Sequence, residues 1–149
     1  MITDFNVKDA NAFEQLNTEW ITKYFELEPN DIKAFQNPKE NIIDKGGRIF
    51  YLYQGETVVG TVSLVKVNDE IFELSKMAVT EKCKGQGAGN LLLQHAISEA
   101  KKMNIRKLFL IGNRKLKPSI HLYQKFGFHE VPLGNQTYKR GDIKMELDL

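Results

Sequence analysis

The stretch that decides the fold is Lys84-Gly85-Gln86-Gly87-Ala88-Gly89-Asn90, here called the Gly-rich loop, which lies between a predicted strand and a predicted helix. Residues 71–79 form an apolar run of strand type, and residues 87–103 carry apolar side chains at helical spacing. Glycines allow positive φ angles and a close approach of the backbone to a ligand. The amides of the first helical turn have no partner within the helix, and the helix dipole favours an anion there. The loop therefore predicts either an anion site or a simple connecting turn.

Strand and helix patterns continue on both sides of the loop. Strands are expected at residues 2–6, 49–53, 57–67, 71–79, 107–111, 129–131 and 142–147. Helices are expected at residues 7–25, 31–35, 87–103 and 118–126. The consecutive strands upstream of the loop are joined by tight turns and predict an antiparallel meander, so the fold class is α/β (α+β) with a mixed sheet. No internal repeat or interdomain linker interrupts residues 1–149, which we interpret as one domain.

The composition narrows the classes of function. The chain has 149 residues, 42% of them hydrophobic, and its net charge of +2 gives no reason to expect a nucleic-acid partner. One cysteine, Cys83, excludes an internal disulfide, and the separated histidines His95, His121 and His129 form no metal-ligand pattern. No apolar run approaches the roughly 20 residues of a membrane span, and no signal peptide is recognisable. We therefore expect a cytoplasmic protein with no metal, no nucleic acid and no membrane partner.

Three kinds of phosphate site use such a loop. A Walker A loop ends in Gly-Lys-Ser or Gly-Lys-Thr, whereas this loop continues Gly89-Asn90-Leu91. A dinucleotide fingerprint needs a third glycine where Asn90 stands, and no ribose-binding acid follows the strand that ends in Gly112-Asn113. The meander upstream also contradicts a dinucleotide fold. Besides a plain connecting turn, these exclusions leave the pyrophosphate of coenzyme A.

Several segments together resemble the GNAT acetyltransferase family. The Gly-rich loop is similar to the family's Arg/Gln-x-x-Gly-x-Gly/Ala motif, with Lys84, Gly87 and Gly89 at the fixed positions. Lys84 departs from the usual Arg or Gln, and it keeps the charge of arginine without its forked donor. Residues 119–128, Ser-Ile-His-Leu-Tyr-Gln-Lys-Phe-Gly-Phe, are similar to the family's Ala-Ile-x-Leu-Tyr-x-Lys-x-Gly-Phe helix. The resemblance implies a GNAT fold, with a mixed, mostly antiparallel sheet of about six to seven strands and helices on both faces.

The resemblance also implies acetyl-CoA as the donor substrate and assigns residues to it. The backbone of Met77-Ala78-Val79 would pair with the pantetheine arm and offer an amide to the thioester carbonyl oxygen. The pyrophosphate would lie against the Gly-rich loop, and Asn113 would replace an asparagine that the family carries before the following helix. Tyr123 matches the tyrosine that protonates the departing thiolate, a role that suits a phenol with a pKa of about 10. Packing of Tyr123 on its helix alone is the alternative.

Glu73 is the predicted general base. A protonated amine, with a pKa of about 10, must lose a proton before it can attack a thioester. Glu73 lies six residues before Val79, where some members of the family place a catalytic glutamate. Strand alternation puts Glu73 and Met77 on one face if no bulge intervenes, and a carboxylate on a mostly buried face is typical of a base with a raised pKa. An ion pair with Lys76 or another basic residue, or a surface position, is the alternative.

These assignments predict transfer of an acetyl group to a primary amine of a small amine, an amino acid or a peptide. Two alternatives stay open: a non-catalytic acyl-CoA-binding sensor or interaction domain, and a transferase for a larger acyl group. The aromatic stripe Trp20, Tyr24 and Phe25 is typical of a core, yet the resemblance places the first two helices and the last hairpin around the acceptor. Glu28 and Asp31 could attract a cationic amine there, or they could form a solvated acidic face.

Two further expectations concern partners. The N-terminal helices resemble the acetyltransferase domain that follows a MarR-type DNA-binding domain in some bacteria. No such DNA-binding domain lies in these 149 residues, so we do not infer DNA binding. The alternating strand expected at residues 142–147 could serve as the edge of a homodimer.

Overall fold

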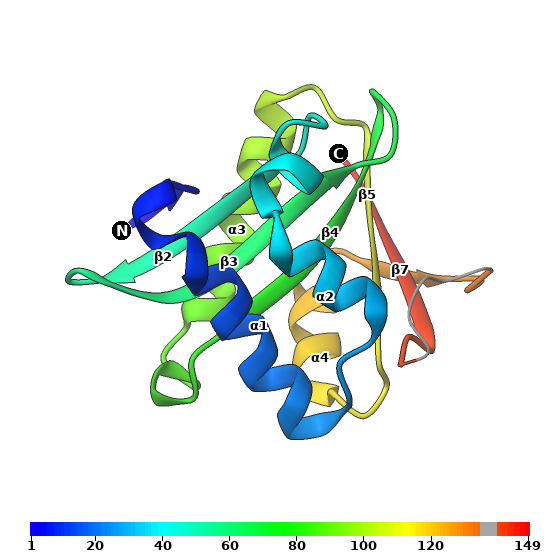
Figure 1. Ribbon diagram of the computed structural model, residues 1–149. Helices are drawn as coiled ribbons and strands as arrows, with labels where there is room; N and C mark the ends of the chain where they lie inside the picture. Colours follow the sequence, from blue (N-terminus) through cyan, green and yellow to red (C-terminus); the bar gives the residue numbers. More distant parts are fainter. Residues whose placement is uncertain (135–139) are drawn as a thin grey trace.

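The computed structural model describes residues 1–134 and 140–149, and its centre is a seven-stranded sheet in the order β1-β2-β3-β4-β5-β7-β6 (Figure 1). The strands are β1 (Ile2–Asp4), β2 (Arg48–Gln54), β3 (Thr57–Lys66), β4 (Ile71–Val79), β5 (Lys107–Gly112), β6 (His129–Val131) and β7 (Ile143–Asp148). Neighbouring strands are antiparallel except β4 and β5, which run parallel. The expected mixed, mostly antiparallel sheet is therefore confirmed.

Helices cover both faces of the sheet. Figure 1 shows α1 (Ala10–Tyr24) and α2 (Pro29–Gln36) in front of the sheet, with α3 (Ala88–Lys102) and α4 (Lys117–Lys125) behind it. Every helix expected from the sequence is present. Two details differ: a 3-10 turn over Val7–Asp9 precedes α1, and a π-helical turn over Lys39–Ile43 lies where no element was expected.

A separate hydrophobic cluster fills the space on each side of the sheet. On the α3 side, Leu92 and Leu93 are fully buried against Phe50, Val62 and other strand residues. The α1 side is smaller; its buried members are Phe13, Ile21, Phe35, Ile42, Ile49 and Tyr51. Each large apolar side chain that leaves water contributes about 1.5–3 kcal/mol. The sheet therefore lies between two hydrophobic cores, and the strand residues that belong to neither cluster are available for a site.

A bulge interrupts β4 just before its end. Thr61 of β3 lies opposite Ala78, but Ser63 lies opposite Ser75, so β4 has one residue more than β3 between these pairs. Lys76, in this bulge, has a φ of 54°, in the left-handed region. The bulge corrects the expectation that Met77 shares a face with Glu73: Met77 packs against the α3-side cluster instead, and Lys76 points toward α2.

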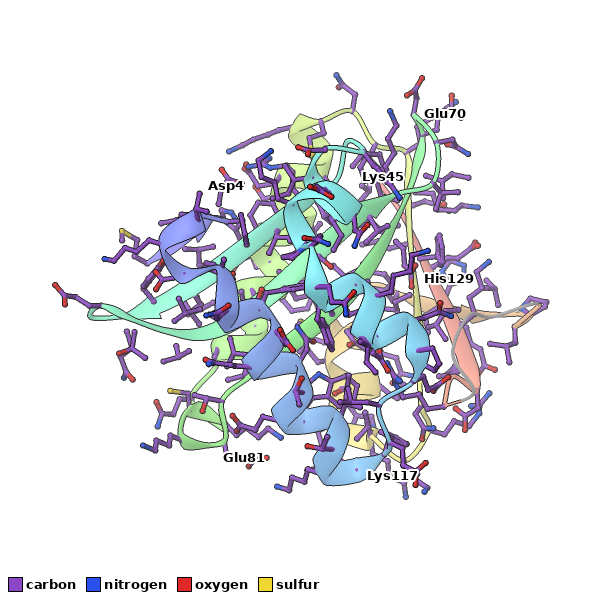
Figure 2. All side chains as sticks on the ribbon, viewed as in Figure 1. Asp4, Lys45, Glu70, Glu81, Lys117 and His129 are labelled. Atoms are coloured by element: carbon purple, nitrogen blue, oxygen red, sulfur yellow. The ribbon has the colours of Figure 1, made fainter. Side chains whose placement is uncertain are left out.

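Beyond Glu73, β4 and β5 separate. β4 pairs with β5 only over Ile71–Glu73, opposite Lys107–Phe109, while the rest of β5 continues to pair with β7. Figure 1 shows the two strands close together near the β3–β4 hairpin and diverging toward the end where α1 and α4 lie. In Figure 2, Glu70 marks the end where the strands are close, and Glu81 and Lys117 lie at the opposite end. The carboxyl-terminal half of β4 therefore has no strand partner on its β5 side among the described residues.

The described residues contain neither a helix that could span a membrane nor a metal-ligand cluster. Over residues 1–134 and 140–149, no helix has the length and apolar character to cross a membrane. Over the same residues, no group of three or more His, Cys, Asp or Glu side chains is arranged to hold a metal ion. Cys83 is a free, buried thiol.

Candidate active site

A cavity of about 880 Å³ lies where β4 and β5 separate. Its wall is formed by α1, β4, the Gly-rich loop, the start of α3, the end of β5 and α4, with Arg140 and Gly141 before β7. All of the predicted site residues line this cavity except Gln86, which is exposed and donates from its side chain to the Lys82 carbonyl at 3.3 Å. Segments that are distant in sequence thus meet in one continuous space.

The Gly-rich loop forms one end of the cavity. Gly85 and Gly87 have φ angles of 80° and 82°, which only glycine adopts without strain, and Gly87 is the residue from which α3 begins. Ala88, Gly89 and Asn90, in the first turn of α3, line the cavity, where their amides and the helix dipole favour an anion.

Cationic side chains surround this end of the cavity. The Lys84 ammonium lies 2.9 Å from a Glu81 carboxylate oxygen and 5.4 Å from the centre of the Tyr24 ring. Lys125 of α4 donates to the Asn90 side-chain oxygen at 2.9 Å. Positive charge, a helix start and a glycine backbone therefore coincide, which is the environment that a phosphate prefers.

The last residues of β4 form a second wall. Ala78 and Val79 pair with Thr61 and Gly60 of β3, so one edge of this segment is occupied. Met77, Ala78 and Val79 all line the cavity on the other side, toward the gap left by β5. An unpaired strand edge presents amides and carbonyls to an extended ligand, in the way that β-augmentation uses a sheet edge.

Tyr123 of α4 also lines the cavity, with its ring 6.0 Å from the ring of Phe128. Burial raises the pKa of the Tyr123 phenol to about 12. The phenol is therefore protonated at neutral pH and can act as a hydrogen-bond donor or an acid.

Asn113 lines the cavity as expected, but both ends of its side-chain amide are engaged within the protein. Its nitrogen donates to the Arg140 carbonyl at 2.6 Å, and its oxygen accepts from the Lys115 amide at 2.8 Å. These bonds join the end of β5 to the segment that enters β7. The contribution of Asn113 in the structure is therefore to hold two parts of the wall together.

Glu73 lies on the wall of the cavity on the α1 and α2 side of the sheet. Burial raises the pKa of its carboxyl above the ordinary value, and the positive charges of Lys76 and Lys144 offset this only in part. The alternative of a Glu73–Lys76 ion pair is not what the structure shows, because the Lys76 ammonium bonds to Asp31 of α2 at 3.2 Å. Glu73 is therefore a partly buried carboxylate that holds a proton more strongly than an exposed glutamate does.

A buried group of charged residues lies beside Glu73 and was not predicted as such. Arg140 bonds to both carboxylate oxygens of Asp31, at 2.7 and 2.8 Å, and also to Glu28 at 3.2 Å. Asp31 is completely buried, so the interpretation of an acidic solvated face is wrong for this residue. The sequence signal for a buried Asp31 was its place three residues after Glu28 in a capping box, with Pro29 at the helix start.

Aromatic side chains close the cavity on the α1 side. Trp20 and Phe25 meet edge to face, with ring centres 6.3 Å apart, and both line the cavity together with Tyr24. The Trp20 indole donates to the buried Asn17, and the Arg140 guanidinium lies 5.9 Å from the Trp20 ring. Trp20 and Phe25 are thus part of the cavity wall and also pack against the α1-side cluster, whereas Tyr24 lines the cavity with 44% of its surface exposed.

Comparisons with known proteins agree with this geometry. Residues 12–128 match the family described as "Acetyltransferase (GNAT) family". YwnH of Bacillus subtilis (strain 168), which carries the provisional name phosphinothricin acetyltransferase, is 27% identical over 151 residues, covering 97% of this chain and 88% of YwnH. A GNAT-family acetyltransferase from Staphylococcus aureus Mu50 shares the fold, with a TM-score of 0.88, 18% identity and coverage of 99% of this chain and 98% of that one.

A second solved structure is an N-acetyltransferase, PaiA of Thermoplasma acidophilum, in complex with coenzyme A. It superposes with a TM-score of 0.75 at 18% identity and covers 100% of this chain and 98% of its own. At 18% identity, the two solved structures are evidence for the fold alone. The match to the family covers residues 12–128, which is most of the chain. The chain belongs to the GNAT acetyltransferase family.

Proposed function

We propose that this protein transfers an acetyl group from acetyl-CoA to a primary amine by direct attack of the amine on the thioester. The observation that carries the proposal is one cavity lined by a helix start, an open strand edge, a carboxylate and a phenol, the last two partly buried. Each of these features supplies one requirement of the reaction: binding of the pyrophosphate, alignment of the thioester, acceptance of a proton and donation of a proton.

The donor end is formed by the Gly-rich loop and β4. The amides of the first turn of α3 would bind the pyrophosphate, with Lys84 and Lys125 close enough to add positive charge. The open edge of Met77-Ala78-Val79 would pair with the pantetheine arm. An amide of this segment aimed at the thioester oxygen would stabilise the negative charge that develops there, which is worth about 2.7–4 kcal/mol for a well-placed donor.

Glu73 and Tyr123 divide the proton transfers between them. Glu73, directly or through a water molecule, takes one proton from the ammonium form of the amine. The neutral nitrogen then forms a bond to the acetyl carbon, the carbon–sulfur bond breaks, and the second proton that the nitrogen loses passes to solvent. The raised pKa of Glu73 makes its carboxylate a stronger base than an exposed glutamate. Tyr123 protonates the departing thiolate, and the two side chains return to their starting states by exchange of one proton with solvent.

The experiment that tests the proposal is a panel assay of the purified chain. Acetyl-CoA, propionyl-CoA and succinyl-CoA are each combined with a library of small amines, amino acids and peptides, and free thiol is monitored. Amine-dependent thiol release with acetyl-CoA is the expected result. A preference for one of the larger donors would instead identify the larger acyl transferase.

The non-catalytic alternative predicts a different pattern. A sensor would bind acetyl-CoA tightly in calorimetry and release no thiol with any amine of the library. That result would overturn the proposed reaction while leaving the donor site intact. The cavity wall beside Glu73 offers both charged and aromatic surfaces to the amine acceptor.

A further inference from the structure

Four charged residues, Glu28, Asp31, Lys76 and Arg140, form a buried group beside Glu73, here called the ion cluster. They come from the start of α2, the bulge of β4 and the segment before β7. The Asp31 side chain is 0% exposed, that of Lys76 is 6% exposed, and that of Arg140 is 11% exposed. The Glu28 side chain is 19% exposed. The ion cluster is therefore mostly shielded from solvent, and two of its members, Lys76 and Arg140, line the cavity.

Asp31 is the common partner of the ion cluster. One of its carboxylate oxygens accepts from Lys76 and Arg140, and the other accepts from Arg140 and from the Glu28 backbone amide at 2.9 Å. Burial raises the pKa of the Asp31 carboxyl, but the hydrogen bonds from Arg140 and Glu28 and the charge of Lys76 outweigh it and lower the pKa below the ordinary value. Asp31 is therefore a permanent negative charge at this position.

Stability alone is a weak explanation for such a group. Well-packed apolar residues usually stabilise a fold as much as a buried ion pair does, because desolvation of the charges is costly. Two separate segments, the bulge of β4 and the segment before β7, nevertheless direct charged side chains to one carboxylate. The arrangement suggests a role in the proposed function of the neighbouring Glu73 as a general base.

The ion cluster determines where the Lys76 ammonium lies. Because of the bulge, Lys76 is on the same side of the sheet as Glu73, only three residues along the chain. It extends toward α2, with its ammonium bonded to Asp31 and 5.6 Å from the centre of the Phe35 ring. Lys144 of β7 also acts on Glu73, and it is shared with Phe109, whose ring it approaches to 4.8 Å. Further charges on this side are Glu28, Arg140 and Glu146, the last 3.9 Å from the Lys144 ammonium.

We propose that Asp31 is a positioning residue for the acetyl transfer: it holds the Lys76 ammonium on α2 and off the Glu73 carboxylate, and so keeps Glu73 available to the amine. The proposal rests on the proposed function, because it assumes that Glu73 is the base. The same contacts fix the bulge, which directly precedes Met77 and hence the strand edge assigned to the donor.

The electrostatic consequence has a definite sign. Removing the charge of Asp31 takes a negative group away from Glu73 and releases Lys76 to pair with it, and both changes favour the ionised form of Glu73. The pKa of Glu73 therefore falls in Asp31→Asn. Removing the charge of Lys76 has the opposite effect, because Lys76 stabilises the ionised Glu73, so the pKa of Glu73 rises in Lys76→Met.

The first measurement is a titration of Glu73 by carboxyl ¹³C NMR in the full chain saturated with coenzyme A, with the resonance assigned by Glu73→Gln. Relative to the unmodified chain, the midpoint is expected to be lower in Asp31→Asn and higher in Lys76→Met. The double variant should move back toward the unmodified value. Asp44→Asn is the matched control, because Asp44 is also paired with a lysine, Lys39 at 3.0 Å, but on the surface; it should leave the midpoint unchanged.

The second measurement is the pH dependence of kcat/KM with the best amine from the panel. Asp31→Asn should lower the plateau of kcat/KM about tenfold or more, because Glu73 is then a weaker base and is paired with Lys76. Its acidic limb should move to lower pH, and that of Lys76→Met should move to higher pH. A residue that only supports the fold would lower the plateau without moving the limb in opposite directions in the two variants.

The outcomes separate the two proposals. Equal Glu73 midpoints in Asp31→Asn, Lys76→Met and the unmodified chain overturn the role of Asp31, even if acetyl transfer is confirmed. Absence of turnover with every amine overturns the proposed function, and the role of Asp31 in transfer with it, whatever the titration gives. If circular dichroism shows that Asp31→Asn is unfolded, Asp31→Ser, which also removes the charge, replaces it in the titration. An unchanged Glu73 midpoint in that variant overturns the role of Asp31.

Discussion

Replacement of Glu73 by glutamine is expected to lower the activity of the protein and to raise its stability. Glutamine has the same shape as glutamate but cannot accept the amine proton at neutral pH. A positioned general base contributes about 10²- to 10⁴-fold to a rate, so kcat should fall by at least about a hundredfold in Glu73→Gln. The acidic limb of the kcat/KM profile, which reports ionisation of Glu73, should disappear. Thiol release measured across the pH range is the assay.

The same variant should be more stable than the unmodified chain at neutral and alkaline pH. Burial raises the pKa of Glu73 in the folded state, which means that the folded state binds this proton more tightly than the unfolded state does. The folded state is therefore penalised as pH rises through the unfolded and folded pKa values of Glu73, by about 1.4 kcal/mol for each unit of elevation. Glu73→Gln removes this penalty, so its melting temperature should exceed that of the unmodified chain above the folded pKa and match it below the unfolded one.

Glu70→Gln is the control for both measurements. Glu70 lies just before β4 and pairs with Arg106 at 3.6 Å. It is at the surface, at the end of the molecule away from the cavity (Figure 2). This variant should change neither the rate nor the pH dependence of stability. Near-normal turnover of Glu73→Gln across the whole pH profile would remove Glu73 from the mechanism. A melting temperature that is lower at alkaline pH would refute the electrostatic argument.

Three further variants probe the remaining walls of the cavity. Tyr123→Phe should lower kcat about ten- to a hundredfold, and uniformly between about pH 6 and pH 10, because the pKa of the phenol is about 12; the thiol assay checks both points. Gly87→Ala should lower stability by about 1–2 kcal/mol and weaken coenzyme A binding in calorimetry, since alanine at a φ of 82° is strained although its Cβ meets no neighbour. Trp20→Ala should raise the KM of the amine several-fold and leave coenzyme A affinity unchanged, because Trp20 lines the α1 side away from the Gly-rich loop.

The sequence predicted the fold well because its elements follow local patterns. The buried stripe of α3 repeats at helical spacing, and the strands upstream have clear turn residues, so both were found within a few positions. The π-helical turn at Lys39–Ile43 was missed, and so was the close approach that follows it. The Gly47 amide donates to the Ile42 carbonyl at 2.8 Å, and a Cβ added to Gly47 would be 2.4 Å from the Leu64 carbonyl oxygen of β3. No periodicity in the sequence encodes such an approach.

The bulge in β4 was left open for a related reason. Alternation in Ile71–Val79 is compatible with a regular strand, and the extra residue is visible only in the register against β3. Lysine rarely adopts a left-handed φ such as that of Lys76, and the local sequence does not favour it. The contact of Lys76 with α2 stabilises this conformation. The structure therefore changed the face assigned to Met77, while the position of Glu73 on the cavity wall followed from alternation before the bulge.

The two ends of the cavity differ in how much of them a sequence can reveal. The proposed donor end uses mostly contiguous residues, because phosphates and a thioester carbonyl would be bound there largely by backbone amides, whose placement follows from glycines and a helix start. The proposed acceptor end uses side chains from separate elements: Asp31 meets Lys76 across 45 positions of the chain and Arg140 across 109. A motif predicts the first kind of site and leaves the second invisible until the chain is folded.

The first helix connects these two ends. α1 places Trp20 at the acceptor end, and near its own end Lys23 bonds to Glu81 at 2.8 Å, on the same carboxylate oxygen that Lys84 approaches. The Glu81 amide in turn donates to Glu19 at 3.1 Å. These surface pairs are screened by solvent and individually weak, so Lys84 can exchange Glu81 for a phosphate at little cost. Lys23 and Glu19 would still hold Glu81 after such an exchange, so α1 would stay attached to the segment before the Gly-rich loop if the loop binds a phosphate as proposed.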